Sequence, residues 1–181
     1  MKTIKFIILT SIVLLSCSCS SDDDDFTEPS LQTVQLNIIG RGISVAQEKN
    51  IIHPQTGEER AAFCFLMNLI DSETGEVIGT LEDCDTGTTE LEDGSLISQI
   101  TTVFNFTGRG TITSESIVLQ EPTGNGFFTT SFIPTENNII DGTFEFEGVR
   151  GKSTLNGEID LNQFDDNIII FNCEFKLELT Y

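Results

Sequence analysis

Apolar and polar residues alternate along most of the chain after residue 30. The final segment is the clearest case, with apolar Phe171, Cys173, Phe175, Leu177 and Leu179 separated by polar Asn172, Glu174, Lys176 and Glu178. A repeat of two residues is typical of a β-strand with one buried face and one solvated face. No segment of useful length has the 3.6-residue repeat of an amphipathic helix. The pattern therefore predicts an all-β domain.

Eight apolar segments follow one another from residue 61, joined by short connections that contain glycine or asparagine. They are 61–70, 77–81, 96–107, 111–120, 126–133, 139–147, 153–161 and 167–180. Eight antiparallel strands can close on themselves, which removes exposed edges and leaves an interior for side chains or one small ligand. We therefore predict a closed antiparallel eight-stranded barrel over 61–181. A β-sandwich is the alternative, because alternation alone does not prove closure.

Residues 31–60 are predicted to be an N-terminal strand followed by a lead-in to the barrel. The strand is expected at 31–39, and the mixed, turn-bearing sequence 43–60 predicts a loop. This loop contains His53, the only histidine. One histidine does not complete a zinc site, so we expect His53 to be an exposed loop residue.

Residues 141–161, DGTFEFEGVRGKSTLNGEIDL, predict a hairpin. Phe144 and Phe146 alternate with glutamates, so both phenylalanines are expected on the buried face. Glycines at 148 and 151 fall where the chain must reverse before the next strand, 153–160.

This hairpin resembles the closing hairpin of allene-oxide-cyclase-like β-barrels, which are calycin-like barrels related in shape to the dirigent proteins. Glu147-Gly148, Arg150-Gly151 and the alternating strand carry the resemblance, with support from 71–80 and 106–113. It covers roughly residues 60–181. It implies a calycin-like fold and a lumen suited to lipophilic ligands. The polar residues of the plant cyclases do not map onto this sequence one by one, so no catalytic residue is assigned.

Phenylalanine dominates the side chains expected to point into the barrel. The expected lumen lining consists of Phe104, Phe106, Phe128, Phe132, Phe144, Phe146, Phe171 and Phe175. Glu115 is added to this lining, because it shares a strand face with Ile117 and Leu119. If that face is the lumen, Glu115 is a buried carboxylate and a candidate site. Both a solid core and an apolar pocket fit this pattern.

Three cysteines fall in the predicted barrel: Cys64, Cys84 and Cys173. Closure is expected to make the strands 61–70 and 167–180 neighbours, so we predict a Cys64–Cys173 disulfide with Cys84 free or marginal. Cys84 lies in a polar loop, so the alternative is that it pairs with either of the other two. A nucleophilic cysteine needs a nearby base or cation, and the sequence places none beside these residues. Structural roles are therefore expected.

Acidic residues gather in two predicted loops, Asp83, Asp85 and Glu90 in one and Asp165 and Asp166 in the other. Either group could hold a calcium ion, but acidic loops are expected in so acidic a chain. We therefore predict no metal site and no cofactor. The sequence also lacks a Ser-His-Asp set, a phosphate-binding loop and a dinucleotide fingerprint.

The first 16 residues predict a signal peptide. Lys2 and Lys5 precede an apolar core, 6–15, that is too short to span a bilayer. Leu14-Leu15-Ser16-Cys17 then resembles the lipobox of bacterial lipoproteins, which implies a lipid on Cys17. An ordinary cleaved signal, a short anchor and lipidation at Cys19 are the alternatives.

Residues 17–30 predict a flexible acidic tether, because the run Asp22–Asp25 repels itself and stays solvated. An acidic run after the lipid-bearing cysteine also resembles the surface-export signal of Bacteroidota lipoproteins. Loss of Lys2 and Lys5 with the signal peptide changes the net charge from −20 to −22. This charge argues against nucleic acid and anionic lipid surfaces as partners. We expect contact with the membrane through the lipid anchor only. The expected location is the outer membrane, with the protein displayed at the cell surface.

The sequence thus favours a non-catalytic envelope lipoprotein whose barrel binds a small apolar ligand or partner. The alternatives are an isomerase or cyclase acting in the lumen, and a structural or adhesive module with a solid core. A deep pocket would separate the first two from the third. A buried polar group at the base of the pocket would favour the enzyme.

Overall fold

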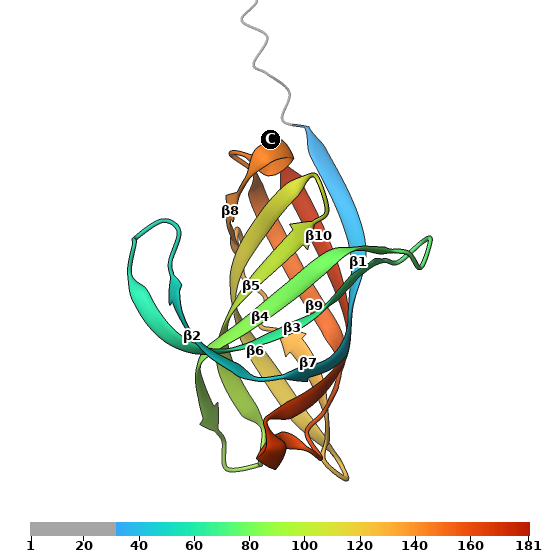
Figure 1. Ribbon diagram of the computed structural model, residues 1–181. Helices are drawn as coiled ribbons and strands as arrows, with labels where there is room; N and C mark the ends of the chain where they lie inside the picture. Colours follow the sequence, from blue (N-terminus) through green and yellow to red (C-terminus); the bar gives the residue numbers. More distant parts are fainter. Residues whose placement is uncertain (1–31) are drawn as a thin grey trace, which may run out of the picture. The chain divides into compact units, whose positions relative to one another are not determined.

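The computed structural model describes residues 32–181, which are almost entirely β-strand (Figure 1). The strands are β1 (Thr33–Val45), β2 (Gln47–Ile52), β3 (Glu59–Asp71), β4 (Val77–Glu90), β5 (Leu96–Phe106), β6 (Gly110–Gly124), β7 (Phe127–Phe132), β8 (Ile139–Gly142), β9 (Arg150–Asp160) and β10 (Ile168–Thr180). Two short 3₁₀ turns, η1 (Phe144–Phe146) and η2 (Phe164–Asp166), complete the fold. Within residues 32–181, no helix has the length and apolar character needed to cross a membrane. The predicted signal peptide, lipidation site Cys17 and tether 17–30 lie outside the described residues.

Eight antiparallel strands close into a barrel, which confirms the predicted fold class. The order around the barrel is β1-β10-β9-β7-β6-β5-β4-β3, and β1 pairs with β3 to complete the ring (Figure 1). The two further strands lie off this ring: β8 pairs with β6 and β9, and β2 extends the free part of β3. Closure rules out the sandwich alternative. A sandwich consists of two separate sheets with free edges, whereas the β1–β3 pairing joins these eight strands into one continuous ring.

The strand that closes the barrel is β1, which the sequence placed outside it. Residues 33–45 pair with 168–180 of β10, while Ile38–Arg41 pair with Asn68–Asp71 of β3. The barrel therefore begins at β1 and not at residue 61. β1 continues through Gly40, which pairs with Cys173, and a Cβ at this position would lie only 3.0 Å from the Phe175 ring. The missing side chain leaves room for the packed interior.

The predicted strand 139–147 is wrong in its second half, because the chain turns across the end of the barrel. β8 ends at Gly142 and η1 follows. The turn breaks the alternation of the two phenylalanines: Phe146 is 1% exposed, whereas Phe144 is 85% exposed. Phe144 therefore does not line the lumen. A Cβ on Gly142 would lie 2.1 Å from the Phe146 carbonyl oxygen, which explains the glycine at this fold-back.

The half of the barrel next to η1 has a solid interior, called the closed half below. Phe106 packs on Phe146 with ring centroids 5.0 Å apart, and Phe104 packs edge-on against Phe175 at 5.3 Å. Arg109 covers the end, with its guanidinium 5.3 Å from the Phe146 ring. The predicted lining residues Phe104, Phe106, Phe132, Phe146, Phe171 and Phe175 are all buried, and Phe128 is half-buried.

Residues 47–60 form the outer part of a hairpin rather than the predicted loop. β2 pairs with Glu59–Cys64 of β3, and this hairpin extends beyond the barrel wall (Figure 1). Its tip returns to the outer face of the barrel, where Gln55 donates a hydrogen bond of 2.8 Å to the carbonyl oxygen of Ile140.

Candidate functional site in the open half of the barrel

The half of the barrel opposite η1 holds a cavity of about 1380 Å³, and we call it the open half. Strands β2 to β5 supply most of its wall, and β6, β7, β9 and β10 supply the rest. Its aromatic lining consists of Phe63, Phe65, Phe128, Phe164 and Phe171. Ligand cavities in proteins typically measure ~300–1,000 Å³, so this space is large enough for a small lipophilic molecule.

The cavity exists because inward-facing side chains become smaller and more polar along β4 and β5. On β4, Leu81 in the closed half is followed by Asp83 and Asp85 on the same face. On β5, Phe104 is followed on the same face by Thr102, Ile100 and then Ser98 toward the cavity. The same strands therefore fill one half of the lumen and leave the other hollow.

Asp83 places a carboxylate in this cavity. It lies directly opposite Thr102 in the β4–β5 register, and the Thr102 hydroxyl donates a hydrogen bond of 2.6 Å to Asp83 Oδ1. The pKa of Asp83 is raised to about 6, mainly by burial and to a smaller extent by the charge of Asp85, while the Thr102 hydrogen bond opposes the shift. The sequence placed Asp83 and Asp85 in a polar link, but β4 continues through Glu90. Their even spacing from Leu81 was the signal that could have placed them in the lumen.

Asp85 is more fully satisfied by its own strand. Its carboxylate accepts a hydrogen bond of 2.7 Å from the backbone N–H of Gly87 and another from the Thr88 hydroxyl, which also contacts Ser98. The β4–β5 register shifts between Asp85 and Gly87. This bulge turns local hydrogen-bond donors toward Asp85.

A small pocket of about 20 Å³ lies at the deep end of the cavity, with Asp83 and Gln120 lining both spaces. Thr130 and Cys173 add polar atoms to the small pocket, which has room for about one water molecule. Burial, followed by the charge of Asp83, raises the pKa of Cys173 to about 12. The thiol therefore stays protonated at neutral pH and is unsuited to nucleophilic chemistry.

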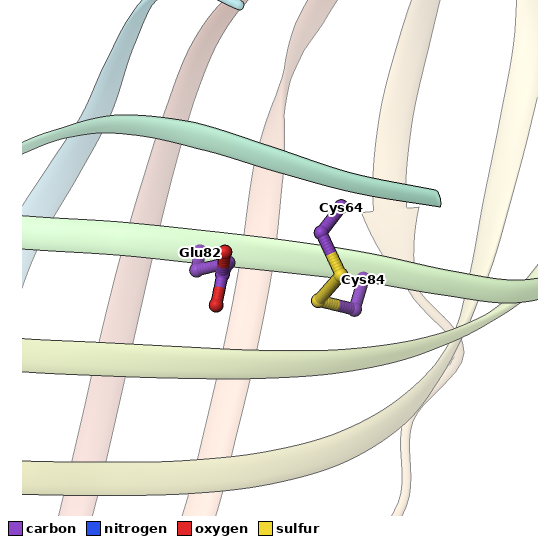
Figure 2. Close-up of side chains that lie close together, drawn as sticks. All are labelled: Cys64, Glu82 and Cys84. Atoms are coloured by element: carbon purple, nitrogen blue, oxygen red, sulfur yellow. A yellow bond between two sulfur atoms is a disulfide. The ribbon is translucent and has the colours of Figure 1, made fainter. Parts of the chain in front are cut away.

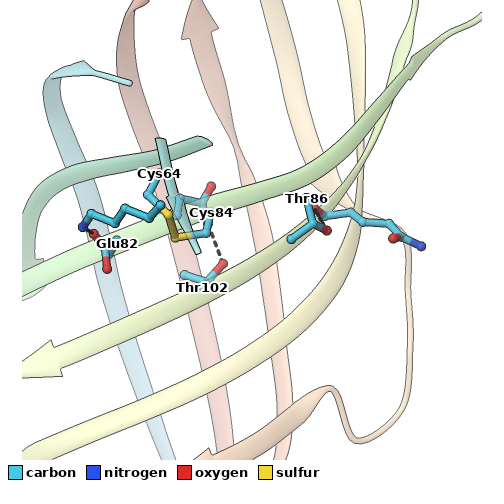
Figure 3. Close-up of a disulfide and its surroundings, with 8 residues drawn as sticks. Cys64, Glu82, Cys84, Thr86 and Thr102 are labelled. Atoms are coloured by element: carbon cyan, nitrogen blue, oxygen red, sulfur yellow. Dashed lines mark hydrogen bonds and ion pairs between the residues drawn. A yellow bond between two sulfur atoms is a disulfide. The ribbon is translucent and has the colours of Figure 1, made fainter. Parts of the chain in front are cut away.

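The disulfide joins Cys64 to Cys84, so the predicted Cys64–Cys173 pair is wrong (Figure 3). Cys64 and Cys84 are directly opposite on β3 and β4, on the outer face of the barrel, where Ala62 and Ile51 pack around them. Cys173 is a free, buried thiol on the inner face of β10. The prediction failed because β1 lies between β3 and β10.

The outer-face group of Cys64, Glu82 and Cys84 is the one cluster within residues 32–181 with a metal-like arrangement (Figure 2). Both sulfur atoms are in the disulfide, so neither is a free thiolate, the form that binds metal. Glu82 forms an ion pair with Lys49. This cluster is therefore structural. The acidic pair Asp165 and Asp166 lies in η2 and belongs to no such cluster in the described part of the chain.

Glu115 is on the outer face of the barrel, so its predicted place in the lumen is wrong. The buried face of β6 carries Ile112 and Val118, which have the opposite parity. Glu115 binds Arg60 at 3.0 Å and His53 at 3.1 Å, and both partners come from the β2–β3 hairpin. Sequence reasoning missed this contact because it spans 62 residues.

His53 is not the exposed loop residue that the sequence predicted, since its side chain is only 9% exposed. Its Nδ1 accepts hydrogen bonds from the backbone N–H groups of Gln55 and Thr56, each at 3.2 Å. The other ring nitrogen, Nε2, therefore carries the hydrogen atom and donates a hydrogen bond of 3.1 Å to Glu115 Oε2. This arrangement fastens the hairpin tip to the barrel wall.

Comparison with known proteins adds no family to this description: no family model matches the chain, and no curated protein matches it. The resemblance to allene-oxide-cyclase-like barrels stays a prediction. The function is therefore argued from the cavity and the residues that line it.

Proposed function

We propose that this protein is a cell-surface lipoprotein of the outer membrane whose barrel binds a small apolar ligand in the open half. The observation that carries the proposal is the cavity of about 1380 Å³ with its wall of phenylalanines. Burial of apolar surface is the dominant favourable contribution to binding of this kind, at about 25 cal/mol per Å². A structural module with a solid core is disfavoured, because only one half of the lumen is filled.

The end of the barrel at which the cavity opens, called the mouth below, has a position consistent with a tethered binding protein. Thr33, at the start of β1, pairs with Thr180 at the closed end of the barrel. The cavity lies at the other end, between residues such as Phe171 and Ile169 of β10. A tether that enters through β1 therefore joins the barrel at the end away from the mouth.

Catalysis in the lumen is a second candidate, and Asp83 is the observation that favours it. A carboxylate with a pKa of about 6 in a cavity has the properties of a general base for an isomerase. Such a reaction also needs an acid or an electrophilic group to stabilise developing charge. Of its titratable neighbours, Asp85 is a second carboxylate that already accepts hydrogen bonds from Gly87 and Thr88, and the Cys173 thiol is a poor acid with a pKa of about 12. We therefore place binding first.

Titration with the neutral dye Nile red tests the binding proposal. We expect saturable fluorescence enhancement with the wild-type protein, and at least a tenfold weaker response from Ala46→Trp, which places a large ring at the cavity wall. Gln99→Trp is the matched control, because Gln99 is exposed on β5 and does not line the cavity. Equal dye binding by Ala46→Trp and wild type, or no binding by the wild type, would contradict the proposal.

The anchor and surface display are tested in cells. Cys17→Ala is expected to abolish labelling by a radioactive fatty acid, whereas Cys19→Ala should retain it. Replacement of Asp22–Asp25 by alanine is expected to protect the protein from protease added to whole cells. Loss of labelling in Cys19→Ala alone would move the lipid to that residue, and unchanged protease sensitivity would refute the export signal.

A further inference from the structure

The cavity wall combines aromatic rings with an excess of negative charge. Its acidic lining residues are Glu48, Asp83, Asp85 and Glu90, and its basic lining residue is Lys49. Lys49 is already neutralised by its ion pair with Glu82 on β4. The ligand therefore meets a negative electrostatic potential inside an apolar wall, where charges are weakly screened.

Asp83 is the carboxylate best placed to bind a ligand. Within residues 32–181 it accepts one side-chain hydrogen bond, from Thr102 to Oδ1, which leaves Oδ2 available. By contrast, both oxygens of Asp85 already accept hydrogen bonds from Gly87 and Thr88. Asp83 also lines both the large cavity and the small pocket beneath it, so it marks the deep end of the site.

Phenylalanine rings surround this deep end. Phe65 lies opposite Asp83 in the β3–β4 register, and its ring centroid is 5.6 Å from that of Phe171. Both rings line the cavity. An organic cation beside Asp83 would gain from the carboxylate and from the ring faces, since cation–π attraction operates within about 6 Å of a ring centroid.

We propose that the open half selects apolar molecules that carry an amine, with the ammonium group on Asp83 and the carbon body against the phenylalanines. This inference rests on the proposed binding function and names its ligand class. A cation compensates the desolvated carboxylate, whereas a neutral ligand leaves it uncompensated and an anionic ligand such as a fatty acid adds repulsion. The arrangement therefore favours amines over alcohols, and alcohols over carboxylates.

Isothermal titration calorimetry with three probes of equal chain length tests this order. Octylamine, 1-octanol and octanoate differ only in the polar group, and octylamine is protonated at neutral pH. We expect octylamine to bind about 10- to 100-fold more tightly than octanol, which is the range for a hydrogen bond to a charged group. Octanoate should bind most weakly.

Asp83→Asn tests the assigned residue. It keeps the size of the side chain and should lower the affinity for octylamine about tenfold or more, while octanol affinity changes less than about threefold. Glu174→Gln is the charge-matched control, because Glu174 is exposed on the outer face of β10, and its octylamine affinity should equal that of wild type. Circular dichroism establishes whether the variants are folded, and the wild-type probe series tests the inference without any variant.

The outcomes separate this inference from the proposed function. If octanol or octanoate binds as tightly as octylamine, the amine preference is wrong, although binding in the lumen stands. If Asp83→Asn and Glu174→Gln weaken octylamine equally, the effect comes from overall charge and the assignment to Asp83 is wrong. If neither Nile red nor any octyl probe binds, both the inference and the proposed function fail.

Discussion

The two halves of the barrel are built by the same strands but have opposite interiors. In the closed half, Leu81 of β4 and Leu177 of β10 are fully buried among phenylalanines. In the open half, the same strands present Asp83 and Phe171 to a cavity. Leu81 and Asp83 of β4, and Leu177 and Phe171 of β10, follow the same two-residue repeat. Side-chain volume and the plug at one end, formed by η1, therefore decide where the lumen is filled.

The two ends differ in one local feature, a plug formed by η1 and the buried residues Phe146 and Val149. η1 turns Phe146 inward onto Phe106, and Val149 is buried beside it. At the other end, Phe164 of η2 lines the cavity and is 52% exposed. The β2–β3 hairpin lies against the outer wall of the barrel, where Glu115 holds it. One end therefore has a packed cap, whereas the other has none, and four predictions test this difference.

Removal of a ring should cost far more stability in the closed half than at the mouth. Phe104→Ala is expected to lower the free energy of unfolding by about 3–5 kcal/mol, because Phe104 is 0% exposed and packed against Phe175. Phe63→Ala should cost about 1 kcal/mol or less, because Phe63 is 50% exposed at the cavity. Urea denaturation measures both. Equal losses would show that the open half is packed as tightly as the closed half.

Loss of the disulfide should have the next largest effect. The double variant Cys64→Ala/Cys84→Ala is expected to lose about 3 kcal/mol, the value for a closed loop of about 20 residues, because the unfolded chain gains conformational freedom. Thermal denaturation compares it with Cys173→Ala, which changes a free thiol. Mass spectrometry of unreduced peptides provides the direct check. A peptide linked through Cys173 would contradict the assignment.

Ionisation of Asp83 should make the open half a source of pH-dependent instability. Its pKa of about 6 lies above the ordinary 3.8, so the folded state holds this proton more firmly than the unfolded chain. The stability it contributes is complete below pH 3.8 and is lost as the pH rises through about 6.

Asp83→Asn removes this loss and should raise the free energy of unfolding at pH 8 by on the order of 2 kcal/mol, with little change at pH 4. Thr102 can still donate to the amide oxygen, the repulsion from Asp85 disappears, and the Cys173 thiol in the same small pocket stays protonated. Urea denaturation across this pH range measures the effect, with Glu174→Gln as control. A variant less stable than wild type at pH 8 would refute the assigned cost.

Release of the hairpin tip should have the smallest effect. Glu115→Ala removes the contacts to His53 and Arg60 and is expected to cost about 1 kcal/mol or less. Hydrogen–deuterium exchange should become faster in β2 and stay unchanged in β10. Glu121→Ala, at an exposed position of β6, is the control and should alter neither strand. Unchanged exchange in β2 would mean that the outer contacts do not hold the hairpin.

The alternating pattern predicted most of the barrel because it depends on local geometry. The segment 167–180 has the predicted inward set, and 153–161 agrees with β9. Gly148 and Gly151 both have positive φ, which L-residues with a side chain rarely adopt. A Cβ on Gly151 would also lie 1.9 Å from the Glu178 carbonyl oxygen, so the β9–β10 pairing requires glycine there.

The errors came from places where the chain leaves its local pattern. The alternation of Phe144 and Phe146 predicted a strand, but η1 holds Phe144 at φ +54° and turns it outward. Glu115 was assigned to the wrong face, because both faces of β6 carry apolar residues and only pairing with β5 and β8 selects the inner one.

By itself, the sequence determined the all-β class, most strand positions and the phenylalanine-rich interior, because each follows from the two-residue repeat. Tertiary structure decided which strands are neighbours, and with them the role of β1 in closure, the Cys64–Cys84 disulfide and the place of Asp83 in the lumen. The physical reason is that pairing in a closed barrel joins residues far apart in sequence, and a local repeat carries no information on the partner.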